Sequence, residues 1–334
     1  MFPRGYVKTF PFVLVTALLV RTAWAEPGGQ TLRSYFVGNS LTNQMDPASI
    51  GALATSRGNA LVFGKHIDFG QALEQMWANP GGADETLSPF GTFPGALTNY
   101  QWDAISLQPF QRPIEGSLGD REALRNFISL ARTHSPNARF FLYSGWPFKY
   151  DGVPLDYEPR WVQPHTGAWD DTIRTRDFFA KLVGAVRQDF PSIARSIVLV
   201  PTGEVMYELN RRMHAGEVPG YSDVGQLYTD QLHLNETGRY LCALTFYATM
   251  YKQDPRGLPY DASVITNPAV AAQLQDAAWQ VVRAHPLAGF RPPYDQVGWP
   301  KFGEPPITPL PEPAGAMVVF ALVAVATRRR RPRA

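Results

Sequence analysis

The stretch of sequence that decides the fold reads RSYFVGNSLT, at residues 33–42. Its first half, Arg33–Val37, is rich in the aromatic and β-branched residues that favour a short strand. The strand ends at Gly38, and Ser40 stands where the chain turns into a helix. Helix N-terminal N–H groups point toward anions, so Ser40 is a candidate nucleophile. The alternative is that it only caps the helix, as serines often do.

Outward from this stretch, strands alternate with helices. We expect strands at 60–63, 102–108, 139–143 and 196–200, and helices at 47–57, around 124–131, at 178–187 and, as the last of them, at 235–252. This alternation predicts a three-layer α/β/α sandwich with a mostly parallel sheet. Open sheets of this kind bind ligands at the carboxyl ends of their strands, which is where Ser40 lies.

A second polar motif, Asp230-Gln231-Leu232-His233, lies just before the predicted last helix, whose expected cap is Asn235. A serine nucleophile needs a base, and the base needs an acceptor on its second ring nitrogen. A single loop can place the Asp230 carboxylate beside the His233 imidazole. The alternative is an ordinary solvated loop histidine.

The two motifs together resemble those of the SGNH (GDSL-type) hydrolase family. Ser40 matches the nucleophile of the first motif, with Asn39 where the family often has Asp. Asp230 and His233 match the last motif, and Gly238 matches its glycine. The resemblance spans nearly all of an SGNH hydrolase-like domain at 26–291. It implies a flavodoxin-like SGNH fold, a Ser-His-Asp triad and a carboxylester hydrolase that needs no cofactor.

Members of this family also use a glycine N–H and an asparagine amide to bind the oxyanion. Gly70 suits the glycine, with Gly64 as its rival. The asparagine is missing, because Gln108 stands in the corresponding place. Its amide is the same donor one methylene further out, so the resemblance implies Gln108 as the remaining oxyanion donor. The alternative is that Gln108 only caps the strand end and hydrogen-bonds the following loop.

Both ends of the chain are typical of processing signals. Residues 1–25 have a basic start, an apolar run and an Ala-Trp-Ala pattern, which predicts a secretory signal peptide rather than a buried first helix. Residues 292–308 form a Pro/Gly-rich linker. The segment 309–334 contains Pro-Glu-Pro, a short apolar run at 314–327 and four consecutive arginines, and it resembles a PEP-CTERM sorting signal. That resemblance implies an exosortase-type processing enzyme, transient inner-membrane contact, and a secreted or cell-surface location in a Gram-negative bacterium.

The net charge, the cysteine content and the spacing of possible metal ligands bear on nucleic-acid binding, disulfides and metal sites. The formal net charge is +2, but much of the positive charge lies in the two processing signals. The remaining chain is acidic and gives no indication of a nucleic-acid partner. Cys242 is the single cysteine, so no internal disulfide can form, and its helical context predicts a core thiol. His66 and Asp68 lack further ligands at a suitable spacing, so we expect no metal site.

One long segment, Gly145–Asp171, interrupts the alternation of strands and helices and is a candidate functional loop. Its aromatic residues either line a sugar-binding face or pack the loop: Trp146, Tyr150, Tyr157, Trp161 and Trp169. We therefore expect an acylated small molecule or polysaccharide as substrate, with deacetylation as the reaction. The alternatives are a catalytically weak glycan-binding surface protein, or a lipid esterase or thioesterase.

Overall fold

The computed structural model describes residues 29–151 and 155–290. At its centre is a six-stranded sheet in the order β3-β2-β1-β4-β5-β6. The strands are β1 Thr31–Gly38, β2 Ala60–Ile67, β3 Glu85–Thr86, β4 Ala104–Leu107, β5 Arg139–Tyr143 and β6 Ile197–Val200. All neighbouring strands pair in parallel except the short edge strand β3, which is antiparallel to β2.

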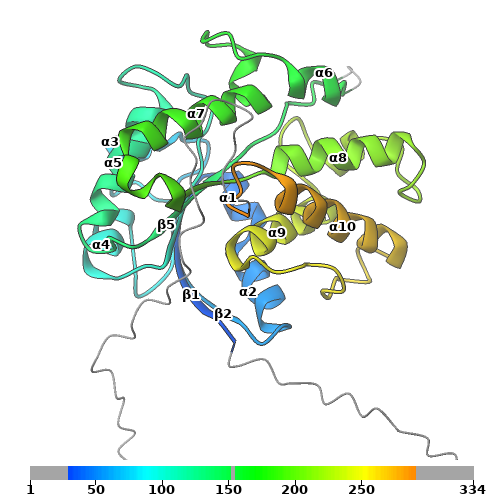
Figure 1. The fold of residues 1–334 in the computed structure, drawn as a ribbon, viewed down its shortest axis with the longest axis horizontal. Helices are drawn as coiled ribbons and strands as arrows, with labels where there is room; N and C mark the ends of the chain where they lie inside the picture. Colours follow the sequence, from blue (N-terminus) through cyan, green and yellow to red (C-terminus); the bar gives the residue numbers. More distant parts are fainter. Residues whose placement is uncertain (1–28, 152–154, 291–334) are drawn as a thin grey trace, which may run out of the picture.

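Two layers of helices cover this sheet (Figure 1). One layer holds α3 Leu73–Ala78, α4 Phe93–Asn99, α5 Asp120–Arg132 and α7 Arg176–Asp189. The other holds α1 Ser40–Met45, α2 Pro47–Thr55, α8 Thr202–His214, α9 Glu236–Tyr251 and α10 Pro268–Ala284. A further short helix, α6 Tyr157–Val162, packs against both α7 and α8. The predicted three-layer α/β/α sandwich with a mostly parallel sheet is thus confirmed.

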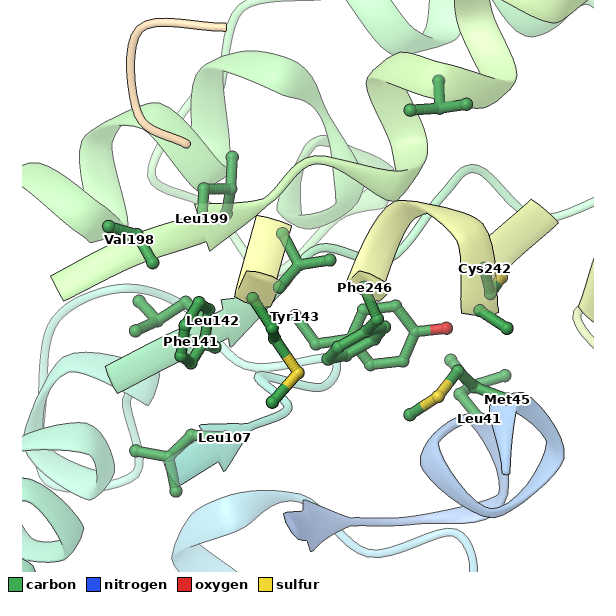
Figure 2. Packing of buried hydrophobic residues seen from close by; sticks show 14 of the residues in the cluster. Leu41, Met45, Leu107, Phe141, Leu142, Tyr143, Val198, Leu199, Cys242 and Phe246 are labelled. Carbon is green, nitrogen blue, oxygen red and sulfur yellow. The ribbon is translucent and has the colours of Figure 1, made fainter. Parts of the chain in front are cut away.

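The centre of the sheet is apolar on both faces, as expected of a parallel strand covered by helices on each side. Tyr35, Phe36 and Val37 of β1 are fully buried between β2 and β4. Figure 2 shows the neighbouring strands packing against α9, where the ring of Phe246 lies against Tyr143 at 4.8 Å between centroids. Leu41 and Met45 of α1 belong to the same cluster. This packing fixes α1, and with it Ser40, against the sheet.

Helix α9 begins where the sequence predicts. The side chain of Asn235 accepts a hydrogen bond from the N–H of Gly238 and caps the helix. Cys242 is 1% exposed within α9, which confirms the predicted core thiol. The prediction that this helix is the last one is wrong, because α10 follows it and packs against α8 and α9.

The predicted signal peptide (1–25), the linker (292–308) and the sorting signal (309–334) lie outside the described residues. Among the helices that are described, none is long and apolar enough to cross a membrane.

Candidate active site

The turn that carries Ser40 is shaped by its neighbours. Asn39 is the N-cap of α1, with extended backbone, and its side chain accepts a hydrogen bond from the N–H of Leu41. Gly38 has no room for a side chain, since a Cβ there would lie 2.2 Å from Oγ1 of Thr42 and 2.6 Å from Oε1 of Gln108. The strand can therefore turn into α1 directly, and Ser40 lies half-buried at the carboxyl edge of the sheet.

The structure brings Asp230 and His233 to this serine. Nε2 of His233 lies 2.9 Å from Oγ of Ser40, and Nδ1 lies 2.7 Å from Oδ2 of Asp230. A carboxylate beside Nδ1 favours the tautomer with its proton there, which leaves Nε2 free to accept a proton from the serine. The three residues predicted from the sequence therefore form a continuous chain of hydrogen bonds.

The Asp230 carboxylate is itself held by the backbone. Its Oδ1 accepts hydrogen bonds from the N–H groups of Leu232, at 2.8 Å, and His233, at 2.7 Å. Partial burial raises the pKa of Asp230, but these N–H groups and the His233 side chain outweigh it and leave the pKa below its usual value. The residue is thus an anion that fixes the orientation of the imidazole.

The loop around His233 is supported by the segment that follows β5. The indole N–H of Trp146 donates to the carbonyl of Leu232 at 2.9 Å, and the N–H of Lys149 donates to the carbonyl of Gln231 at 2.8 Å. The hydroxyl of Tyr228 donates to the carbonyl of Pro147 at 2.9 Å. The segment Gly145–Asp171 stands out in the sequence, but these contacts to the loop of His233 have no signal there.

Two backbone N–H groups near Ser40 are candidates for binding an oxyanion. The turn after β2 follows the end of β1 closely, since the N–H of Asp68 donates to the carbonyl of Gly38 at 3.1 Å and the Asn39 amide donates to the carbonyl of Gln71 at 3.0 Å. Gly70 lies between these two contacts, with φ at 74°. Within residues 29–151 and 155–290, the N–H groups of Ser40 and Gly70 have no hydrogen-bond partner.

Gly64, the rival of Gly70, lies elsewhere. It is a residue of β2 paired with Tyr35, and a Cβ there would come within 2.7 Å of the Tyr35 ring. Gly64 is therefore needed for packing inside the sheet, while Gly70 lies at the edge where Ser40 is found.

Gln108 is engaged in the turn that carries the nucleophile. Its Oε1 accepts hydrogen bonds from the N–H of Asn39 at 3.2 Å, the N–H of Thr42 at 3.1 Å and the Thr42 hydroxyl at 2.6 Å. Its Nε2 donates to Oδ1 of Asn39 at 2.8 Å. The side chain is only 2% exposed. These contacts hold the nucleophile turn rather than the loop after Gln108, which neither expectation included, and donation to an oxyanion stays a prediction.

The described residues contain no group of three or more side chains suited to bind a metal ion. His66 is buried, and its Nδ1 accepts a hydrogen bond from the N–H of Phe93 at 3.4 Å. Burial lowers the pKa of His66 to about 4, so the ring is neutral. His66 therefore belongs to the packing between β2 and α4.

The aromatic residues of Gly145–Asp171 divide into two groups. Trp146, Tyr157 and Trp161 are buried and pack the segment onto the core. Trp169 is 59% exposed. Of the two expectations for this segment, packing thus accounts for most of these residues and leaves Trp169 unexplained.

The sequence matches no protein-family model and no curated protein. Among solved structures, the chain is similar to a DUF4886 family protein from Bacteroides uniformis, with a TM-score of 0.53 and 19% identity over 76% of this chain and 96% of that chain. It is also similar to a family 3 carbohydrate esterase of Clostridium thermocellum, with a TM-score of 0.39 and 16% identity over 65% of this chain and 94% of that one. A third is a member of the lipolytic G-D-S-L family from Veillonella parvula, with a TM-score of 0.39 and 15% identity over 66% of this chain and 99% of that one. The first of these similarities shows a shared fold.

Proposed function

We propose that this protein is a serine esterase of the SGNH type that hydrolyses carboxylic esters. Ser40 is the nucleophile, His233 the general base and Asp230 the residue that orients it. The observation that carries the proposal is the chain of hydrogen bonds from Asp230 through His233 to Ser40, at 2.7 and 2.9 Å. Asn39, not Ser40, caps α1, so helix capping does not account for the Ser40 hydroxyl.

In the proposed reaction, Oγ of Ser40 attacks the acyl carbonyl while Nε2 of His233 takes the serine proton. The N–H groups of Ser40 and Gly70 bind the oxyanion of the tetrahedral intermediate. His233 then gives its proton to the leaving alcohol, and the acyl group remains on Ser40. A water molecule, deprotonated by His233, then attacks this acyl-enzyme. As the second tetrahedral intermediate collapses, His233 returns the proton to Oγ of Ser40, which releases the carboxylic acid and restores the free serine.

The substrate we propose is an acylated small molecule or polysaccharide, with acetyl as the group removed. We further propose that the reaction takes place outside the cytoplasm, after export and sorting by an exosortase-type enzyme with transient inner-membrane contact. This part of the proposal rests on the sequences of residues 1–25 and 309–334.

The test is turnover of p-nitrophenyl acetate by the purified protein and by Ser40→Ala. We expect the substitution to lower kcat by roughly 10⁴-fold or more, since the remaining groups cannot supply a nucleophile. Ser49→Ala, which changes an exposed serine on α2, is the matched control and should leave kcat unchanged. Activity of Ser40→Ala within a few-fold of wild type would refute the proposal, and a wild type without turnover would favour a glycan-binding protein.

A further inference from the structure

The segment Gly145–Asp171 connects the two helix layers at the edge of the sheet where Ser40 lies. Its first part supports the loop of His233, which leads into α9. Its middle part, α6, packs against α7 of one layer and α8 of the other. Its last part reaches the layer of α3 and α5, where the guanidinium of Arg112 lies over the ring of Trp169 at 5.2 Å from its centroid.

Glu74 lies in α3 and Arg112 in the loop after β4, and each is close in sequence to a residue that hydrogen-bonds the nucleophile turn. Gln71, whose carbonyl binds the Asn39 amide, precedes Glu74 by three residues, so the two Cα atoms are within roughly 11 Å. Arg112 follows Gln108, the other residue bound to Asn39. Nε of Arg112 donates to Oε1 of Glu74 at 2.6 Å and joins this loop to α3. The Arg112–Trp169 pair is thus linked to the nucleophile turn through the segments of Gln71 and Gln108.

This pair has polar groups without partners. An arginine carries five N–H donors. In the described part of the chain, those of Arg112 contact only Oε1 of Glu74 and, at 3.4 Å, the carbonyl of Gln111. Oε2 of Glu74 is buried and has no hydrogen-bond partner there. The indole of Trp169 is 59% exposed, and the guanidinium of Arg112 lies over one of its faces.

We propose that Trp169, Arg112 and Glu74 form a subsite for an uncharged sugar ring of the substrate. The indole offers a flat apolar surface on which the C–H face of a pyranose can stack. The unused N–H groups of Arg112, which Glu74 holds in place, can bind its hydroxyls. The inference rests on the proposed function, and it specifies the substrate as an ester of a glycan.

The charges favour a neutral sugar over an acidic one. The guanidinium of Arg112 is paired with Glu74, and the carboxyl of Asp120, fully buried, faces the same pair. A uronate would thus meet no net positive charge. A long acyl chain would also be a poor ligand, since burying it here would remove water from charged groups.

The experiment compares two kinds of substrate. kcat and KM are measured for p-nitrophenyl acetate, which has no sugar, and for acetylated cello-, xylo- and manno-oligosaccharides. Trp169→Ala should raise KM for at least one oligosaccharide about 10-fold or more and change kcat/KM for p-nitrophenyl acetate less than about two-fold. Trp169→Tyr, which keeps an aromatic ring, should recover most of the loss. Val162→Ala removes another exposed apolar side chain of the segment and is the matched control.

Several results would overturn this subsite. If Trp169→Ala loses equal activity on both kinds of substrate, Trp169 has a structural role only. If Trp169→Ala loses no activity on any oligosaccharide, Trp169 takes no part in sugar recognition. A loss confined to acetylated oligogalacturonate would indicate an acid-binding site, and a loss confined to p-nitrophenyl octanoate would indicate a lipid-binding site. A wild type that cleaves p-nitrophenyl acetate but no neutral acetylated oligosaccharide would also contradict it.

Binding to the Ser40→Ala protein separates this inference from the proposed function. Calorimetric titration with the same oligosaccharides needs no catalysis. Combining Trp169→Ala with Ser40→Ala should weaken that binding about 10-fold or more, even where the wild type fails to cleave p-nitrophenyl acetate. Equal affinity with and without Trp169 would refute the subsite while leaving the esterase proposal intact.

Discussion

Gln108 illustrates how much one buried amide can hold in place. Its Oε1 accepts three hydrogen bonds from Asn39 and Thr42, the residues that flank Ser40 and Leu41 in the nucleophile turn. From the sequence alone, the amide of Gln108 suggested an oxyanion donor, because it is the same chemical group as the asparagine amide that the family uses. The partners that give it another role lie 66 and 69 residues away, so no local pattern could indicate them.

The two roles of Gln108 predict different responses to substitution. If Oε1 holds the turn, Gln108→Glu keeps an acceptor for all three donors and loses only the N–H donated to Oδ1 of Asn39, while Gln108→Ala loses all four contacts. We expect Gln108→Ala to lower kcat roughly 10- to 100-fold and the free energy of unfolding by about 1–3 kcal/mol, with Gln108→Glu clearly more active. Steady-state kinetics well below the melting temperature would measure this. A loss of kcat in Gln108→Ala with no loss of stability would instead support donation by the amide to the oxyanion.

Ser40, Asp230 and His233 are the residues for which the sequence was most informative. Each lies in a short motif of recognisable spacing, and the structure brings all three within hydrogen-bonding distance. Gly70 lies in the turn next to β1, as expected, whereas Gly64 lies within a strand. Motifs thus indicated the residues that would meet, but not what holds them together.

At the scale of elements, the predicted strands are all present, because continuous apolar runs between turn residues mark buried parallel strands. Helix α10 was missed even though Asn267 and Pro268 give a recognisable helix start. Helix α8 was also missed. It begins at Thr202, one residue after β6, although Pro201 marks the end of that strand. The role of the segment after β5 was not predictable, since Trp146 and Leu232 are 86 residues apart.

We predict that Trp146 supports catalysis through the loop of the base. Trp146→Phe removes the N–H donated to the Leu232 carbonyl while retaining a ring in the core. We expect kcat for p-nitrophenyl acetate to fall about 5- to 20-fold as the position of His233 becomes less well defined.

Trp161→Phe is the matched control for this substitution. Trp161 is equally buried, at 2% exposed, and its indole N–H donates to Glu204 at 2.7 Å rather than to the loop of the base. Both variants should lose a similar amount of stability in thermal unfolding, but only Trp146→Phe should lose activity. Equal kcat in the two variants would show that the Trp146 contact serves folding alone.

At the scale of the whole molecule, both predicted processing signals flank a domain that packs around one sheet. We predict that protein exported by its native host lacks residues 1–25 and the apolar run with its arginines. Intact-mass analysis of the released protein would measure both cleavages. Arginines 328–331 still attached to protein found outside the cell would contradict the sorting assignment.

The central claim is that His233 activates Ser40 as a nucleophile, and covalent labelling tests it most directly. The protein is treated with a fluorophosphonate, and the site of the adduct is mapped by peptide mass spectrometry. We expect one adduct, on Ser40, that is absent from Ser40→Ala and forms roughly 10²-fold or more slowly in His233→Ala. An adduct on another serine, or equal labelling rates with and without His233, would contradict it.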